Sequence, residues 1–347
     1  MIRSRELRRW TLASTAAAAL LALGTAAATA ADLSDAIRTP SMFTTSSAPA
    51  DEIAEYSMLV LGVCAAIFAV VAGLLIVTVV RFRARPEDEG REPPQVYGST
   101  QVELAWTVVP LLIVVLLGLV TARNILALQK DTRPPGWLPI TAIGHQWWWE
   151  FHYPEAGVVT ANELHLPVGR PAFFDLKSED VIHSFWVPQL SGKTDLIPNR
   201  TNHLWMEPRE PGVYVGQCAE YCGTQHANML LRVVVHTAED FERWLSRQRA
   251  DAAEDPAVSE GRRVFETTAC INCHSVRGTN ADGHFGPDLT HLMSRSTLAA
   301  GAAPNNRAEL IDWITDPDHI KPGARMPAMK LEPEQIAKVA DFLGSLQ

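Results

Sequence analysis

Residues 218–229 read CAEYCGTQHANM, the stretch that says most about how this chain folds and what it binds. The stretch supplies two thiols, an imidazole and a thioether, at Cys218, Cys222, His226 and Met229. Such soft ligands favour copper, whereas zinc would accept the cysteines and the histidine but has little use for methionine. A Cys218–Cys222 disulfide is the alternative in an oxidising compartment, but it leaves the histidine and the methionine without a role. His183, further upstream, is a candidate to complete the set, although a lone histidine is more often a packed or surface residue.

This stretch lies near the end of a block, residues 137–236, that is rich in short apolar runs. The runs are residues 138–143, 171–176, 213–216 and 230–235. Proline and glycine separate them, and short runs divided by turn residues are typical of a small β-sandwich or barrel. The sequence therefore predicts an all-β domain over residues 137–236.

Two uncharged stretches, residues 56–80 and 104–122, precede the β-rich block. About 20 mostly apolar residues suffice for a helix that crosses the hydrocarbon core of a membrane. Two buried core helices are the alternative, but long parts of both stretches have no polar face. We therefore predict a transmembrane hairpin of two helices, at residues 56–80 and 104–123, joined by a loop at residues 81–103.

The beginning of the chain has the pattern of an exported protein. Four arginines, a long uncharged stretch and the small residues Ala28 and Ala30 predict a signal peptide over residues 1–30, with a first membrane helix as the alternative. The loop at residues 81–103 contains more arginines than the segment at residues 31–55, so the loop should be cytoplasmic. Residues 31–55 and everything after the hairpin then lie outside the cytoplasm.

A second motif, CINCH, occupies residues 270–274. Two cysteines at this spacing attach haem through its vinyl groups, and the adjacent His274 binds the iron. The alternatives are a redox-active cysteine pair, which lacks its usual βαβ context here, and half of a zinc site, which lacks a second cysteine pair. Met326, in the run GARMP, resembles the methionine that binds the iron in class I cytochromes c, with Met329 as its rival.

The residues around the CINCH motif predict a helical domain. Residues 237–255 are charged and form a predicted linker, which opens with a helix capped by Thr237. Residues 256–347 are predicted to be mostly helical, because the last segment has apolar residues at helical spacing after Pro333. The proline of the GPDL run, Pro287, resembles the residue whose carbonyl accepts a hydrogen bond from the haem-binding histidine in this class.

Together these motifs resemble subunit II of cytochrome c oxidase. The C-x-E-x-C-x-x-x-H-x-x-M pattern is similar to its dinuclear copper site, CuA, and three more runs match the family: GHQWWW at 144–149, HSFWVP at 183–188 and KTDLIP at 193–198. The resemblance covers roughly residues 50–236, and the haem motif adds the variant with a cytochrome c fused at the C-terminus, the caa type. It implies a multidomain fold: a two-helix transmembrane hairpin, an all-β cupredoxin-like sandwich and an all-α class I cytochrome c domain.

The resemblance also implies roles for the matching residues. The sulfurs of Cys218 and Cys222 would bridge two coppers, and His183 and His226 would bind one copper each. The Met229 thioether would bind one copper weakly, and the backbone carbonyl of Glu220 would bind the other weakly. The carboxylate of Glu220 would also bind Mg²⁺ at the junction with subunit I. Trp147 matches the tryptophan through which electrons enter, and Glu103 the carboxylate at the mouth of a proton pathway. The alternatives are a structural aromatic for Trp147 and a helix-end charge for Glu103.

The expected function is that of the electron-entry subunit of a proton-pumping cytochrome c oxidase in the cell membrane. Electrons would pass from the covalent haem c on Cys270 and Cys273 to CuA, and on to haem in subunit I, where O₂ is reduced. Expected partners are subunit I, subunit III and a donor such as a cytochrome c or a quinol–cytochrome c reductase complex. The alternatives are a membrane-anchored carrier that serves another terminal reductase, and a copper-delivery protein whose sulfur pair cycles as a disulfide.

The overall composition agrees with this organisation and excludes other classes. The mean hydropathy of +0.00 averages apolar segments with large polar ones. The net charge of −9 argues against a protein that coats nucleic acid. Five cysteines in 347 residues are too few for a disulfide scaffold, and a chain of this length is more than one small module.

Overall fold

The computed structural model describes residues 40–347, except for 84, 87–89, 91, 93–94, 96 and 130–132. The predicted signal peptide at residues 1–30 lies outside the described residues, as does the part of the predicted segment 31–55 that precedes residue 40. The predicted cytoplasmic loop, residues 81–103, is described only in part.

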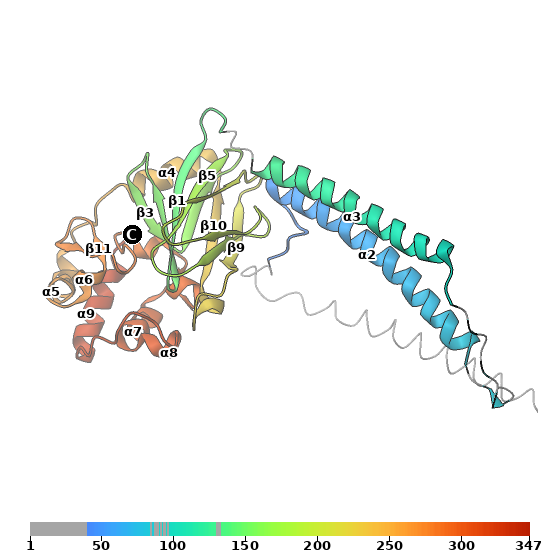
Figure 1. Cartoon of the computed structure of the whole chain (residues 1–347). Coiled ribbons are helices and arrows are strands. Elements are labelled where there is room, and N and C mark those ends of the chain that lie inside the picture. Colours follow the sequence, from blue (N-terminus) through green and yellow to red (C-terminus); the bar gives the residue numbers. More distant parts are fainter. Residues whose placement is uncertain are drawn as a thin grey trace, which may run out of the picture. The chain divides into compact units, whose positions relative to one another are not determined.

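Two long helices, α2 (Ala48–Arg81) and α3 (Thr100–Leu128), are apolar enough to cross a membrane (Figure 1). The most apolar windows of both helices are exposed rather than buried in protein. The two helices contact each other, and the hydroxyl groups of Tyr56 on α2 and Thr121 on α3 form a hydrogen bond. Their exposed apolar surface is that of a membrane hairpin rather than of a soluble core.

Polar contacts connect the helical hairpin to the β-rich block. The Asp51 carboxylate, in the first turn of α2, forms a 2.5 Å ion pair with Arg209. The indole Nε1 of Trp205 donates to the carbonyl of Leu128, the last residue of α3, at 3.1 Å. Trp205 therefore has a structural role, because its indole satisfies a carbonyl that the end of the helix leaves without an intrahelical partner.

Two five-stranded sheets form the middle of the chain. Their strand orders are β3-β2-β1-β5-β8 and β4-β10-β9-β6-β7. The strands of the first sheet are β1 (Leu138–His145), β2 (Trp148–Tyr153), β3 (Val158–Ala161), β5 (Ala172–Ser178) and β8 (Asn202–Met206). Those of the second are β4 (Glu163–Pro167), β6 (His183–Trp186), β7 (Thr194–Leu196), β9 (Gly212–Cys218) and β10 (Leu230–His236). The predicted all-β, cupredoxin-like sandwich is confirmed.

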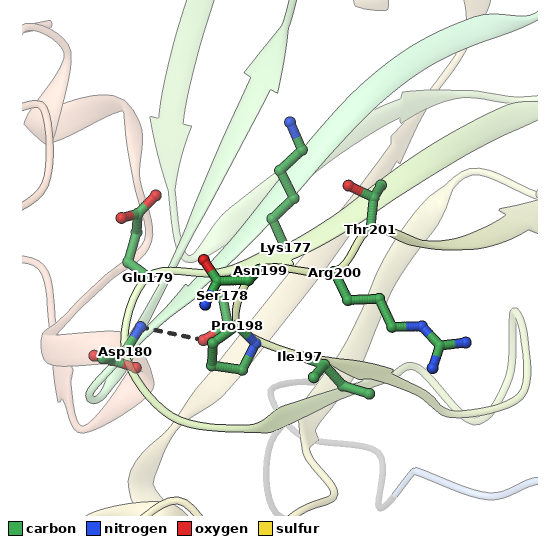
Figure 2. Close-up of a pocket in the computed structure, with 9 residues that line it drawn as sticks. All are labelled: Lys177, Ser178, Glu179, Asp180, Ile197, Pro198, Asn199, Arg200 and Thr201. Atoms are coloured by element: carbon green, nitrogen blue, oxygen red, sulfur yellow. Dashed lines mark hydrogen bonds between the residues drawn. The ribbon is translucent and has the colours of Figure 1, made fainter.

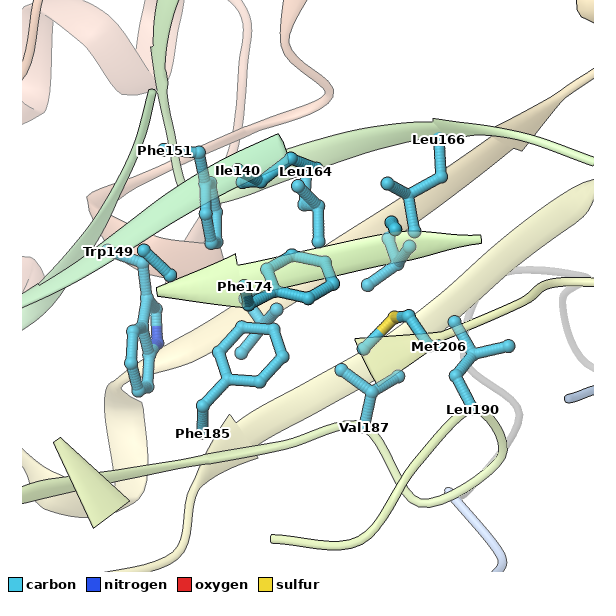
Figure 3. Packing of buried hydrophobic residues seen from close by; sticks show 14 of the residues in the cluster. Ile140, Trp149, Phe151, Leu164, Leu166, Phe174, Phe185, Val187, Leu190 and Met206 are labelled. Atoms are coloured by element: carbon cyan, nitrogen blue, oxygen red, sulfur yellow. The ribbon is translucent and has the colours of Figure 1, made fainter. Parts of the chain in front are cut away.

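Alternating side chains along the strands fill the space between the two sheets. Buried and half-buried residues alternate throughout β1, β2 and β10, which is the period of a strand with one face in a core. Trp149, Phe174 and Phe185 are almost fully buried there (Figure 3). The Phe185 ring lies 5.5 Å from the indole of Trp149, edge-on, and 5.9 Å from the ring of Phe174. These aromatic contacts fix the start of β6, the strand that begins with His183.

The helix α4 (Ala238–Gln248) follows the last strand of the sandwich. The predicted cap is confirmed, because the Thr237 hydroxyl accepts a hydrogen bond from the amide of Asp240. Phe241 and Trp244 are buried in the core of the sandwich. This part of the predicted linker is therefore a packed helix.

A stack of three rings, in which Trp244 and His165 are buried and His236 is half-buried, joins α4 to the sandwich. Trp244 stacks on His165 with ring centroids 4.1 Å apart, and His165 Nδ1 lies 2.8 Å from His236 Nε2. Burial lowers the pKa of both histidines, and that of His165 falls well below its usual value. The folded protein therefore keeps this pair neutral at a pH where the unfolded chain is protonated.

We expect acid to destabilise the sandwich through this pair. Below pH 6.5 the unfolded chain binds more protons than the folded chain, so the free energy of unfolding falls as the pH falls. The loss is up to about 1.4 kcal/mol per pH unit for each histidine. A His165→Gln variant should therefore show a smaller drop in Tm between pH 7.5 and pH 5.5 than the unmodified protein, measured by tryptophan fluorescence. His203→Gln, at an exposed histidine, is the matched control. An unchanged drop in His165→Gln would contradict the assignment.

The remainder of the chain is a helical domain with short strands. Its helices are α5 (Ser259–Thr267), α6 (Cys270–Cys273), α7 (Arg307–Thr315), α8 (Pro317–Ile320) and α9 (Pro333–Gly344). Its short 3₁₀ turns are η3 (Pro256–Val258), η4 (Leu292–Ser294) and η5 (Ala299–Gly301); a further one, η2 (His226–Asn228), lies in the sandwich between β9 and β10. The short strands are β11 (Ser275–Val276), β12 (Ala281–Asp282), β13 (Thr297–Leu298) and β14 (Ala303–Pro304).

The close approach of α5 and α9 organises this helical domain. A Cβ atom at Gly261 on α5 would lie 1.9 Å from the carbonyl oxygen of Lys338 on α9, so only glycine fits at this position. Phe265 and Phe342 pack beside this crossing, with ring centroids 5.5 Å apart. The predicted helical cytochrome c fold is confirmed, and the crossing holds the CINCH motif of α6 directly after α5.

Candidate metal centre

The predicted copper ligands come together at one end of the second sheet. Strand β6 begins with His183 and strand β9 ends with Cys218, and the two strands are paired in the sheet. The loop after β9 contains Cys222 and the short turn η2, which starts at His226. The loop closes because the amide of Cys218 donates to the carbonyl of Met229 at 3.0 Å. The sheet therefore places an upstream histidine beside a ligand loop that lies far away in sequence.

Each donor atom of this cluster lies within 4.0 Å of a neighbouring donor. The two sulfurs of Cys218 and Cys222 are 3.8 Å apart, and both cysteines are buried free thiols. His183 Nδ1 lies 4.0 Å from the Cys218 sulfur, and His226 Nδ1 lies 3.6 Å from the Cys222 sulfur. The Met229 sulfur is 3.8 Å from that of Cys222. Two thiols, two imidazoles and a thioether in one cluster, in which all but the half-buried His226 are buried, suit a soft metal such as copper.

Hydrogen bonds stabilise the thiolate form of Cys218. The pKa of Cys218 is lowered, first by the hydrogen bond with Cys222 and further by bonds with His183 and backbone groups, although burial opposes this. The Glu220 carbonyl oxygen also lies 3.2 Å from the Cys218 sulfur, but as an acceptor it bonds only the protonated thiol. The thiolate is the form of cysteine that binds metal, so the contacts that lower this pKa prepare the cluster for an ion.

Asp180 is a residue of this site that sequence reasoning missed. Its Oδ1 lies 2.8 Å from His183 Nε2, and its Oδ2 accepts a 2.6 Å hydrogen bond from the amide of Gln146. Burial alone would lower the pKa of His183, but the bonds with Asp180 and Cys218 outweigh it and raise that pKa. A carboxylate on the far nitrogen orients the ring and leaves Nδ1 facing the sulfurs. The only sequence signal was an acidic residue three positions before a histidine.

A small pocket lies beside this carboxylate, between the loops that follow β5 and β7 (Figure 2). Its lining is mostly polar and is made of residues 177–180 and 197–201. Asp180 is the residue that joins the pocket to the metal cluster, and its amide donates to the Ser178 hydroxyl at 3.3 Å. The predicted metal ligands do not line the pocket.

The three consecutive tryptophans have different surroundings. Trp147 is half-buried, and its Nε1 donates to the Cys222 carbonyl at 3.0 Å. Trp148 stacks on His145, with ring centroids 4.2 Å apart. Trp149 is fully buried in the core, and its Nε1 donates to the Met229 carbonyl at 3.4 Å. Trp147 is therefore the one that is both partly accessible and bonded to a predicted metal ligand.

The second predicted site is built around His274. Its Nδ1 lies 2.8 Å from the Pro287 carbonyl, so the predicted contact is confirmed. A Cβ atom at Gly286 would lie 2.6 Å from the imidazole, so glycine allows the chain to pass this close to the ring. Cys270 and Cys273 are half-buried free thiols on the helical turn before the histidine. This arrangement fits a covalent haem, with Nε2 as the nitrogen left for the iron.

The surroundings of the other predicted site residues do not assign them a role. Met326 and Met329 are both half-buried, and among the described contacts none joins either sulfur to His274. The choice of Met326 as iron ligand stays a prediction. The side chain of Glu220 is exposed, and Glu103 is exposed in the first turn of α3.

Fold and sites together define a membrane-anchored protein with a cupredoxin-like domain and a cytochrome c domain. Residues 38–123 match the transmembrane domain of cytochrome c oxidase subunit II, residues 156–237 match its periplasmic domain, and residues 258–347 match the cytochrome c family. The chain belongs to the cytochrome c oxidase subunit 2 family. It is therefore a subunit of a membrane-bound oxidase complex.

Bacterial proteins of this family are similar to the chain over most of its length. Cytochrome c oxidase subunit 2 of Alkalihalophilus pseudofirmus is 36% identical over 292 residues, which cover 82% of this chain and 84% of that protein. Cytochrome c oxidase subunit 2 of Bacillus subtilis is 30% identical over 289 residues, which cover 78% of this chain and 81% of that protein. The solved periplasmic domain of subunit II from Bradyrhizobium japonicum is 30% identical, covers 34% of this chain and 97% of that domain, and aligns with a TM-score of 0.33.

Proposed function

We propose that this chain is the electron-entry subunit of a proton-pumping cytochrome c oxidase. The observation that carries the proposal is the cluster of two thiols, two imidazoles and one thioether at the end of the sandwich. In the proposal, Cys218 and Cys222 would hold two coppers through their thiolates. The other ligands are His183, His226, Met229 and the backbone carbonyl of Glu220. When bound, haem c and CuA supply the redox levels through which electrons move towards subunit I for the reduction of O₂ to water.

Each protein group in this proposal has a positioning task. Asp180 holds the far nitrogen of His183 and thereby orients its ring, while the Pro287 carbonyl does the same for His274. Cys270 and Cys273 would hold the haem c covalently, and Met326 would hold its iron together with His274. Both copper-binding cysteines are buried, which shields the ligand atoms from water.

Contacts with the other subunits and with the donor complete the proposal. The half-buried Trp147 is the point of electron entry, because its indole is bonded to the carbonyl of Cys222. The exposed carboxylate of Glu220 binds Mg²⁺ at the junction with subunit I. Glu103 stands at the mouth of a proton pathway into subunit I. The protein lies in the cell membrane, with both soluble domains on its outer side. Its partners are subunits I and III and an electron donor, which is a cytochrome c or a quinol–cytochrome c reductase complex.

Electron paramagnetic resonance of the purified copper-replete complex tests the proposal. We expect the multi-line hyperfine pattern of two equivalent coppers that share one unpaired electron, together with oxygen uptake by a co-purified subunit that contains haem. A complex with full copper occupancy but without that pattern would rule out CuA. The pattern without oxygen uptake would instead favour a carrier that serves another reductase.

A further inference from the structure

A buried lysine joins the helical domain to the copper-ligand loop. Lys321 follows α8, and only 4% of its surface is exposed. Its Nζ donates to three backbone carbonyls: that of Trp147 at 2.8 Å, that of Asn228 at 2.9 Å and that of Ala299 at 3.0 Å. An ammonium group has three N–H donors and no acceptor, so this arrangement satisfies all of them. Two of the acceptors belong to the sandwich, and the third belongs to the helical domain.

The residues after Lys321 continue the contact with the sandwich. The Pro322 carbonyl accepts a 2.5 Å hydrogen bond from Gln225 Nε2, and Gln225 immediately precedes His226 in the ligand loop. The Arg325 guanidinium donates to the side-chain oxygen of Gln146, next to Trp147. The segment 321–325 therefore contacts both loops at the copper site. It leads directly into Met326, the predicted iron ligand.

A second polar contact holds the same two domains together elsewhere. Glu163, on β4, is buried to 2% exposure, and its Oε1 accepts hydrogen bonds from the Ser296 amide at 2.7 Å and the Ser296 hydroxyl at 2.5 Å. Arg232, on β10, donates to the Thr297 hydroxyl at 2.6 Å. The domain contact is thus built from directional polar bonds at two separate places.

A lysine is not expected at a buried contact whose only role is packing. Lysine is almost never fully buried unless its charge is paired, because removing the ammonium group from water is costly. Burial also lowers the pKa of Lys321 to about 7. An apolar side chain would fill the space without this cost, but it could not bind carbonyls from both domains at one point.

We propose that Lys321 is a positioning residue that docks the methionine loop of the haem domain onto the copper-ligand loop. The reason for this docking rests on the proposed function, because electron transfer between two centres slows steeply as their separation grows. In that function one electron would pass from haem c to the copper centre, and no bond would form or break. The docking itself is a property of residues 146–147, 225–228 and 321–325 and can be measured independently.

The test compares Lys321→Met with Lys338→Met in the complete complex. Methionine is unbranched like lysine and one atom shorter, and it removes all three donors; Lys338 is a half-exposed lysine on α9 of the same domain. Hydrogen–deuterium exchange is followed for residues 146–149, 224–229 and 321–326. The rate of electron equilibration from haem c to copper is followed after a reducing flash. Covalent haem content and copper content are measured first, so that a misfolded variant is recognised.

In Lys321→Met we expect exchange in all three segments to rise roughly tenfold or more, the factor given by a single lost hydrogen bond to a charged group. The equilibration rate should fall as well, because the undocked molecules that raise exchange hold the two centres further apart, and Lys338→Met should match the unmodified protein in both. If Lys321→Met does not fold, Glu163→Ala, which opens the second contact, should raise exchange in the same three segments.

Two outcomes overturn the inference. Unchanged exchange in Lys321→Met would show that the lysine does not dock the two loops. Raised exchange with an unchanged equilibration rate would show that docking has no positioning role. Should the unmodified protein transfer no electron from haem c to copper, the proposed function fails, and the exchange comparison still decides the docking.

Discussion

Replacing Cys218 by serine should stop electron transfer beyond haem c, while haem c itself is still reduced by the donor. The serine hydroxyl is a hard, neutral ligand that does not ionise at neutral pH, so it cannot replace a bridging thiolate. The Cys218 sulfur lies 4.0 Å from His183 Nδ1 and 3.8 Å from the Cys222 sulfur, so it is one of the donors that form the cluster. The expected loss of oxidase turnover is therefore to background rather than partial.

The measurement is oxygen uptake together with the optical reduction of haem c in the same sample. Cys64→Ser is the matched control, because Cys64 is an exposed residue of α2 away from both sites. That variant should retain full turnover. Normal turnover in Cys218→Ser would remove the copper cluster from the function.

Replacing Met326 by alanine should lower the reduction potential of haem c by on the order of 0.1 V, a part of the roughly 0.8 V range that axial ligands span. A thioether stabilises ferrous iron, so its loss favours the ferric state. The haem should stay attached, because Cys270 and Cys273 hold it covalently. Spectroelectrochemical titration gives the potential, and the far-red charge-transfer band reports the sulfur–iron bond.

Met329→Ala is the matched comparison for this prediction. Both methionines are half-buried and lie in the same loop, so general disturbance of the loop should be similar in the two variants. We expect Met329→Ala to leave both the reduction potential of haem c and the far-red charge-transfer band unchanged. If Met326→Ala keeps them and Met329→Ala loses them, the axial ligand is Met329.

Much of this architecture is local in sequence and could be predicted for that reason. The spacing of Cys218, Cys222, His226 and Met229 lies within one loop, and the CINCH motif lies within one helical turn. The hairpin is also local, because a helix satisfies its own backbone in a membrane whatever the rest of the chain does. The caps of α4 and the apolar face of α9 follow from neighbouring residues as well.

Contacts between distant segments could not be predicted in this way. Asp180 is unremarkable in the sequence and acquires its role only because β6 places His183 beside β9. Trp205 and Trp244 had no assigned role, yet one binds the end of α3 and the other stacks on His165. The pairing of strands and the packing of rings depend on the whole fold, so no short sequence pattern predicts them.

By itself, the sequence determined the class of this protein: a membrane hairpin, a soft-metal loop and a haem motif, each encoded by residue types at fixed local spacing. Only the tertiary structure decided that Trp147 is the partly accessible tryptophan bonded to the ligand loop, and that Lys321 joins that loop to the loop of Met326. The physical reason is that metal-binding motifs require donors at set spacings along the chain. A buried lysine needs three acceptors, and only the packed domains bring those carbonyls together.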